Sequence, residues 1–262
     1  MSFKILQRGT VALFILTLAA FIALKVYTIL SVDTTPPVIT FAQDVLDVGI
    51  GAKTDDLLAG VTATDDRDGD VTGEVMVKGV SHLITANTAQ ITYIAFDSSN
   101  NMSTATRTLR YTNYEKPRFT LTRPLMFSIG SQVSILEHLT AQDVVDGDLS
   151  NSVRVTTQNV DDTRSGVYSV TVQVTNSLGD VEILPLKLTM TDSARVTPAV
   201  ELSSYIVYLP VGRTFSPAGY ILSPTDPSTV TVEGRVDTTH PGVYELSYTC
   251  QGDTVYQTVV VR

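Results

Sequence analysis

The feature that most constrains this chain is an apolar run near its N-terminus. Residues 11–32 read VALFILTLAAFIALKVYTILSV and contain a single charge, Lys25. As a helix with a rise of about 1.5 Å per residue, this run extends roughly 33 Å, which is enough to cross the hydrocarbon core of a bilayer. We therefore expect a transmembrane helix over 11–32 that contacts the lipid bilayer directly.

The charges beside the apolar run predict its orientation. Lys4 and Arg8 precede it, and no acidic residue does. Because positively charged flanks stay on the cytoplasmic side, we expect residues 1–10 in the cytoplasm and the C-terminal region outside the cell. A cleaved signal peptide is the alternative. The run is long for a signal core, however, and no Ala-x-Ala site follows it, so we favour an uncleaved signal anchor in the cell membrane.

The rest of the chain is acidic and almost free of cysteine. All 27 Asp and Glu residues lie beyond residue 32, together with all but three of the 18 Lys and Arg residues. Such a surface repels polyanions, which excludes nucleic acid as a partner. The single cysteine, Cys250, allows no internal disulfide, which favours a bacterial surface protein over an extracellular animal domain. We expect Cys250 to be a small buried hydrophobe in a strand.

Three similar segments follow the apolar run, at 36–112, 116–192 and 197–262. Each opens after a proline with a strand of alternating polarity, and each closes with another. Strands rich in Val, Ile, Thr and Tyr, separated by turn residues, are typical of antiparallel sandwiches. We therefore predict an all-β fold, a tandem array of three Ig-like β-sandwiches after one N-terminal transmembrane helix. The linkers are short and contain proline, which predicts a semi-rigid rod.

Two motifs recur among these domains. The first and second domains share an acidic loop, TATDDRDGDVT at 62–72 and TAQDVVDGDLS at 140–150. The second and third share SGVYSVTVQV at 165–174 and PGVYELSYTC at 241–250. This order of motifs resembles the bacterial surface immunoglobulin-like domain, a repeat also appended to some pesticidal crystal proteins. The resemblance covers nearly all of 36–262 and implies the fold. Because such modules mostly serve as spacers or binding domains, it implies no particular activity.

The acidic loops are the candidate site, and two interpretations of them remain open. Crowded carboxylates suit calcium, which takes six to eight oxygen ligands. Asp-Gly steps, on the other hand, favour turns whose own amides bond to the flanking carboxylates. If the loops bind calcium, the first domain should bind it more tightly than the second, and the third should not bind it; we expect no other cofactor. The candidate ligands are Asp65, Asp66, Asp68, Asp70 and Asp97 in the first domain, and Asp143, Asp146 and Asp148, with Asn176 nearby, in the second.

The sequence shows no catalytic set. Its histidines, His82, His138 and His240, fall at non-equivalent places, and no nucleophile elbow, phosphate-binding glycine loop or HExxH motif occurs. We therefore do not expect an enzyme. The expected function is that of a membrane-anchored extracellular surface protein, a non-catalytic binding, adhesion or spacer rod whose partner is an unidentified extracellular protein or glycan. The alternative is an accessory structural subunit of a larger bacterial envelope complex.

Overall fold

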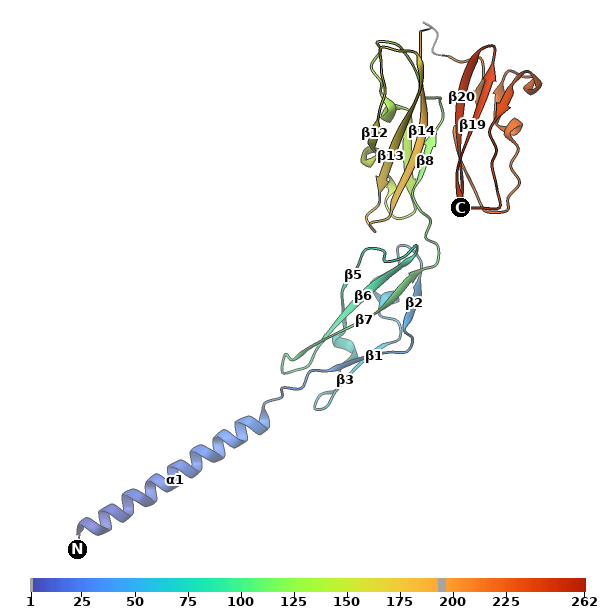
Figure 1. Cartoon of the computed structure of the whole chain (residues 1–262). Coiled ribbons are helices and arrows are strands. Elements are labelled where there is room, and N and C mark those ends of the chain that lie inside the picture. Colours follow the sequence, from blue (N-terminus) through green and yellow to red (C-terminus); the bar gives the residue numbers. More distant parts are fainter. Residues whose placement is uncertain (1, 193–196) are drawn as a thin grey trace. The chain divides into compact units, whose positions relative to one another are not determined.

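The computed structural model describes residues 2–192 and 197–262. A long apolar helix, α1 (Ser2–Ser31), lies at its N-terminus (Figure 1). The segment Gln7–Ile29 is long and apolar enough to cross a membrane, and none of it is buried. A signal sequence near an N-terminus has the same character. Thr17 and Thr28 fit this apolar surface because each hydroxyl donates to a helix carbonyl three or four residues earlier.

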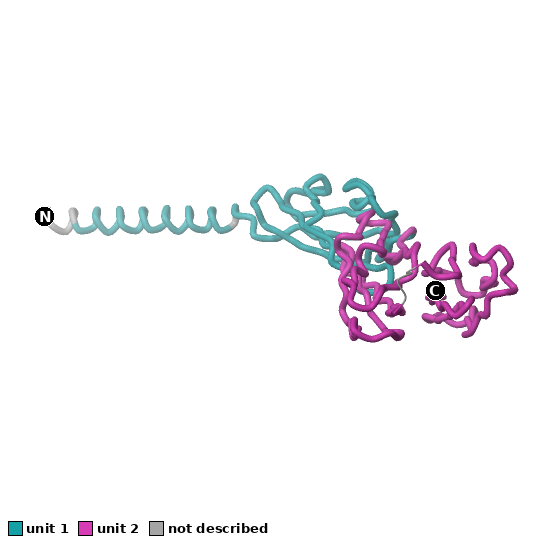
Figure 2. The backbone as a smooth tube through the Cα atoms, turned by 90° about the horizontal axis from the view of Figure 1, so that it is seen from above, with its two compact units in different colours: residues 1–112 teal, residues 113–262 magenta. Residues whose placement is uncertain are grey.

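The chain divides into two compact units, residues 1–112 and 113–262 (Figure 2). The first unit holds α1 and the first domain, and the second unit holds the second and third domains. The expected junction between those two domains, at 193–196, lies outside the described residues.

The first domain consists of two sheets and two short helices. One sheet has the order β1 (Val38–Phe41), β3 (Val61–Asp65), β4 (Gly69–Asp70), and the other has the order β2 (Val45–Val48), β7 (Met102–Tyr111), β6 (Thr88–Phe96), β5 (Met76–Val80). The short helices are α2 (Thr54–Leu57) and the 3-10 helix η1 (Thr72–Glu74), neither of which the sequence predicted. Alternate residues of the strands fill the core, with Ile91, Tyr93 and Leu109 fully buried.

The second domain repeats this arrangement. Its sheets have the orders β11 (Gly147–Asp148), β10 (Leu139–Asp143), β8 (Arg118–Leu121), and β12 (Arg154–Gln158), β13 (Gly166–Thr175), β14 (Val181–Thr191), β9 (Met126–Ser128). Its 3-10 helices are η2 (Ile135–Glu137) and η3 (Ser150–Ser152).

The third domain keeps the four-stranded sheet and shortens the other one. The sheets are β15 (Glu201–Leu202) with β17 (Ile221–Ser223), and β16 (Ile206–Leu209), β20 (Asp253–Val261), β19 (Gly242–Cys250), β18 (Thr231–Glu233), with the 3-10 helices η4 (Pro217–Tyr220) and η5 (Pro227–Thr229). In all three domains a short edge strand runs parallel to the last long strand: β2 to β7, β9 to β14 and β16 to β20. The predicted fold class, Ig-like sandwiches after one N-terminal helix, is confirmed.

The motif shared by the second and third domains opens equivalent strands, as expected. β13 begins at Gly166 and β19 begins at Gly242. In both strands the next residue, valine, is exposed, and the tyrosine after it is partly buried. Cys250 ends β19 and is buried and unpaired, which confirms its predicted role as a small core residue.

The second and third domains lie side by side and share one hydrophobic core (Figure 1). The amide of Tyr205 donates to the carbonyl of Leu121 at 3.0 Å, and the amide of Phe119 donates to the hydroxyl of Tyr208 at 2.9 Å. The prediction of a rod is therefore wrong for these two domains. The physical reason is that β16 is buried on both faces, so that one face packs in the third domain and the other against the second.

Candidate metal centre

The acidic loop of the first domain is a tight β3–β4 hairpin. Along β3 the residues Val61, Ala63 and Asp65 alternate onto the buried face, so Asp65 continues the core series. Asp65 pairs with Gly69, whose φ of 74° gives the left-handed conformation that this turn needs. The predicted Asp-Gly turn is confirmed.

One carboxylate oxygen of Asp65 stabilises this turn. Its Oδ1 accepts hydrogen bonds from the amide of Arg67 at 2.9 Å and from the amide of Asp68 at 3.0 Å. These two bonds lower the pKa of Asp65, and the bond from Asp68 has the largest effect. Asp65 therefore stays ionised.

The other oxygen of Asp65 has no such support. Asp65 is only 9% exposed, and its Oδ2 is fully buried without a hydrogen-bond partner among the described residues. Asp97, directly after β6, is 6% exposed. Carboxylate oxygens of Asp65, Asp68 and Asp97 lie within 4.8 Å of one another. The structure thus brings Asp97 to the acidic loop, as the sequence predicted.

Asp68 and Asp97 are both held by the loop that joins β6 and β7. Asp68 accepts hydrogen bonds from the amide of Ser98 at 2.7 Å and from its hydroxyl at 2.9 Å. Asp97 accepts from the amide of Asn101 at 2.7 Å and from its side-chain Nδ2 at 2.6 Å. A cavity of about 390 Å³ borders this arrangement and includes Asp68, Asp97 and Glu74 in its lining. Solvent and small ions therefore have a route to the carboxylates.

A residue that the sequence analysis missed completes the group. Asp33 lies in the linker that follows α1 (residues 32–37) and is 7% exposed. Its carboxylate, with those of Asp65 and Asp66, forms a second set of oxygens within 4.8 Å of one another. Asn101 holds the linker in place, since its Nδ2 also donates to the carbonyl of Asp33 at 3.2 Å. We call Asp33, Asp65, Asp66, Asp68 and Asp97 the Asp65 cluster.

Asp70 stands apart from the Asp65 cluster. Its Oδ1 accepts from the amide of Thr72 at 2.9 Å at the start of η1. In the second domain Asp148 accepts in the same way from the amide and the hydroxyl of Ser150, at 2.9 and 2.6 Å. The side chains of Thr72 and Ser150, followed by their amides, lower the pKa of the two carboxyls. Both aspartates are thus turn-forming residues.

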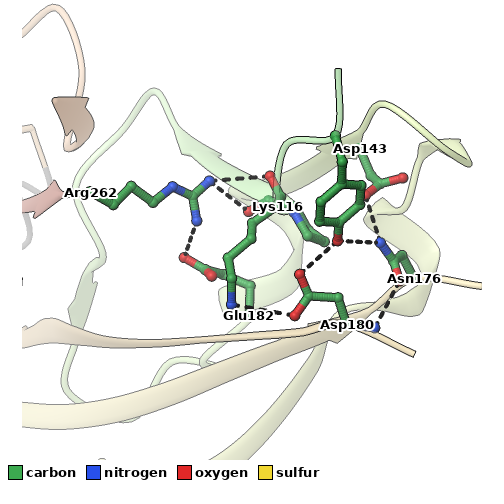
Figure 3. Close-up of polar contacts among 8 residues, drawn as sticks. Lys116, Asp143, Asn176, Asp180, Glu182 and Arg262 are labelled. Atoms are coloured by element: carbon green, nitrogen blue, oxygen red, sulfur yellow. Dashed lines mark hydrogen bonds and ion pairs between the residues drawn. The ribbon is translucent and has the colours of Figure 1, made fainter. Parts of the chain in front are cut away.

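The second domain satisfies its half-buried aspartate, Asp143, with a side-chain amide. Asp143 Oδ1 accepts from the amides of Val145 and Asp146, at 2.6 and 2.9 Å. Asp143 Oδ2 accepts from Nδ2 of Asn176 at 2.9 Å (Figure 3). Asn176, which follows β13, therefore gives Asp143 the donor that Asp65 lacks in the first domain.

Further contacts fix the orientation of the Asn176 amide. Its Oδ1 accepts from the amide of Asp180 at 2.9 Å, and its Nδ2 also donates to the hydroxyl of Tyr114 at 3.0 Å. That hydroxyl in turn donates to Asp180 at 2.6 Å, and Lys116 lies 3.3 Å from the same carboxylate (Figure 3). Burial raises the pKa of Tyr114 and keeps it a donor. The second domain therefore meets the hydrogen-bonding needs of Asp143 and Asn176 internally.

The third domain keeps one aspartate at the corresponding loop. Asp226 accepts from the amide of Ser228 at 3.0 Å and caps η5. Within 197–262 the structure brings no three carboxylates together.

A separate concave surface lies between the second and third domains. This cleft has a volume of about 810 Å³. Its lining mixes aromatic, charged and apolar side chains, among them Arg123, Phe127, His138, Glu201 and Tyr205.

No family model matches the chain. Among curated proteins it is similar to the pesticidal crystal protein Cry22Aa of Bacillus thuringiensis, with 28% identity over 133 residues. This match covers 49% of the chain and only 18% of the relative's length. It agrees with a β-sandwich surface domain without fixing the type of repeat.

Solved structures with similar features are β-domain proteins from several sources. One is the structure of CBM51-2 in complex with GlcNAc and of INT domains from Clostridium perfringens ZmpB. It is 18% identical, the match covers 56% of this chain and 26% of that chain, and the TM-score is 0.24. A protocadherin gammaB7 EC3-6 structure is 12% identical. The match covers 85% of this chain and 73% of that chain, with a TM-score of 0.21. The lipoprotein BT2262 of Bacteroides thetaiotaomicron has 11% identity, coverage of 85% and 98%, and a TM-score of 0.23.

Proposed function

We propose that this chain is a membrane-anchored, extracytoplasmic and non-catalytic module of the bacterial surface Ig-like type, which binds or spaces partners outside the cell. The observation that carries the proposal is the exposure of α1. From Gln7 to Ile29 the helix is apolar and none of it is buried. Such a surface is strongly unfavourable in water and favourable in lipid, so a bilayer is the environment that suits it.

The charges near α1 support one orientation. Lys4 and Arg8 precede the apolar segment, while the domains that follow are acidic. Under the positive-inside rule the N-terminus stays in the cytoplasm and the three domains lie outside. There, the cleft between the second and third domains offers a concave surface for an extracellular protein or glycan.

Cysteine labelling of intact cells tests this topology. Wild-type Cys250 is buried and should resist a membrane-impermeant maleimide, which makes the wild type its own control. We expect Lys78→Cys, at an exposed position of β5, to be labelled on intact cells. Ser2→Cys should be labelled only after lysis. Labelling in the opposite order would refute the orientation. A mature protein whose mass lacks residues 1–32 would show that the helix is a cleaved signal.

A further inference from the structure

The first and second domains solve the same electrostatic problem in different ways. In each, the last aspartate of a core strand uses Oδ1 to hold a turn. The Oδ2 atom of Asp65 is fully buried, whereas Asp143 is only half-buried. A buried anionic oxygen is costly unless a donor or a cation faces it. Asn176 donates to Asp143 at 2.9 Å, whereas Asp97, at the matching position of the first domain, is another carboxylate. We propose that the Asp65 cluster binds one calcium ion, which takes the place of that amide and joins the linker 32–37 to the first domain.

The charges around Asp65 call for a cation. Oxygens of Asp65, Asp68 and Asp97 lie within 4.8 Å of one another, and those of Asp33, Asp65 and Asp66 form an overlapping group. The cationic side chain of this loop, Arg67, directs Nη1 to the carbonyl of Ser31 at 3.1 Å. Carboxylates at such distances repel one another unless a cation or further donors compensate their charge. The two groups share Asp65, so one cation beside this residue would compensate carboxylates of both.

The ligand chemistry selects calcium among common metals. Every clustered donor is a hard carboxylate oxygen, and neither histidine nor cysteine takes part. Calcium accepts six to eight oxygens in irregular geometry, whereas magnesium demands a near-ideal octahedron and retains several waters. Carboxylates from a linker, a hairpin and a second loop provide an irregular set. Affinity in the range of extracellular modules, roughly 10⁻⁴ to 10⁻³ M, is expected.

The position of Asp33 gives the ion a structural effect. Asp33 belongs to the linker after α1, and the other ligands belong to the first domain. Asn101 already contacts this linker, through 3.2 and 3.4 Å bonds to the carbonyls of Asp33 and Thr35. Bound calcium adds a direct bridge, so the linker should become ordered when calcium is present.

Calcium titration of the full-length chain in detergent micelles tests the proposal. After treatment with EDTA and its removal, isothermal titration calorimetry should find one saturable calcium site in the wild type. Asp97→Asn should abolish this site yet remain folded in EDTA, because its amide can donate to Asp65 as Asn176 does to Asp143. Asp70→Asn is the matched control, a carboxylate of the same loop outside the Asp65 cluster, and it should bind as the wild type does.

Hydrogen exchange supplies an independent measurement. Amides in residues 32–40 should exchange at least about ten-fold more slowly in 10 mM calcium than in EDTA, and Asp33→Asn should reduce this difference. Circular dichroism verifies that Asp97→Asn is folded. If it is not, Asp68→Asn replaces it, since the amide oxygen of that variant can still accept from Ser98. The proposal is overturned by the lack of a saturable site up to 10 mM calcium, by wild-type binding in the cluster variant, or by equal ordering of the linker through mild acid alone.

Discussion

Arg262 should hold the second and third domains together, and its removal provides a quantitative test. The guanidinium pairs with Glu182 at 3.0 Å and donates to the carbonyls of Lys116 and Pro117 at 3.1 and 3.3 Å (Figure 3). It also lies over the ring of Tyr208, 4.6 Å from the centroid. Arg262→Ala removes all of these contacts and leaves a buried carboxylate behind.

The expected loss of stability at this interface depends on how far the Arg262–Glu182 ion pair is buried. Breaking a fully buried ion pair costs about 3–5 kcal/mol. The side chain of Arg262 is 24% exposed and that of Glu182 is 10% exposed, so water screens part of this interaction. We expect Arg262→Ala to lower the free energy of opening this interface by about 2–3 kcal/mol. Because every 1.4 kcal/mol is ten-fold, amide exchange at the interface should accelerate by about 30- to 150-fold.

The assay reads one amide. Tyr205 donates its amide to the carbonyl of Leu121 across the interface, so its hydrogen-exchange protection reports the opening. Arg118→Ala is the matched control, because Arg118 also lies over Tyr208 but its ion pair with Glu115 is about half exposed. A change of no more than about 1 kcal/mol is expected there. Equal protection of Tyr205 in the wild type and in Arg262→Ala would refute this account.

The pH dependence of the Arg262→Ala defect has a definite sign. Burial raises the pKa of Glu182, and Arg262 opposes this effect. A carboxyl with a raised pKa in the folded state favours folding at low pH and loses that contribution as the pH rises through its folded pKa. The defect should therefore be largest near pH 7, diminish as the pH falls through the raised pKa of Glu182, and be smallest below the ordinary value of 4.5, where Glu182 is protonated.

Two further predictions concern turns of the third domain. Gly234→Ala places a Cβ 2.5 Å from the carbonyl oxygen of Glu245 at a φ of 103°, and should destabilise the second unit by about 2–4 kcal/mol in thermal melts. Gly212→Ala, at a φ of 81° with open space around it, should cost only about 1 kcal/mol, and equal losses would contradict the steric argument. Asp237 accepts from the hydroxyl of Thr239, which with the Thr239 amide and His240 lowers the Asp237 pKa to about 2. The contribution of the Asp237 carboxylate to folding stability is present above the ordinary pKa of 3.8 and is lost as the pH falls toward 2. The melting temperatures of the wild type and Asp237→Asn should therefore differ at pH 7 and converge near pH 2.

Much of the fold follows from local sequence patterns. Alternating strands, the Asp-Gly turns and the Gly-Val-Tyr strand starts depend on neighbouring residues, and the structure has them where the sequence predicted them. The proximity of Asp97 to the acidic loop was also predictable, because it follows a core strand of the same domain. Asp33 was not, since its approach depends on the β1–β3 register, in which Val38 pairs with Thr64.

Two other features required more than local patterns. Asn176 resembles a weak metal ligand by residue type, but Tyr114 and Asp180 orient its amide so that it acts as a donor. The side-by-side packing of the second and third domains left a signal in the run YIVYL at 205–209, where consecutive apolar residues replace the alternating pattern. Such a run is typical of a strand buried on both faces, but it does not identify the surface that covers the second face.

The contacts of Arg262 also impose an order on biosynthesis. The first domain draws its core from residues within 1–112 and can complete it while later residues are still being made. The second domain cannot complete its core in this way, because several of its contacts need residues that are made later. Glu182 pairs with Arg262, and Leu121 and Phe119 bond to Tyr205 and to the strand at 206–209. At 5–20 residues per second, synthesis from Glu182 to Arg262 takes roughly 4–16 s. During that interval an apolar face of the nascent second domain stays uncovered. This stage of synthesis is therefore the one at which the chain most needs a chaperone and is most exposed to aggregation.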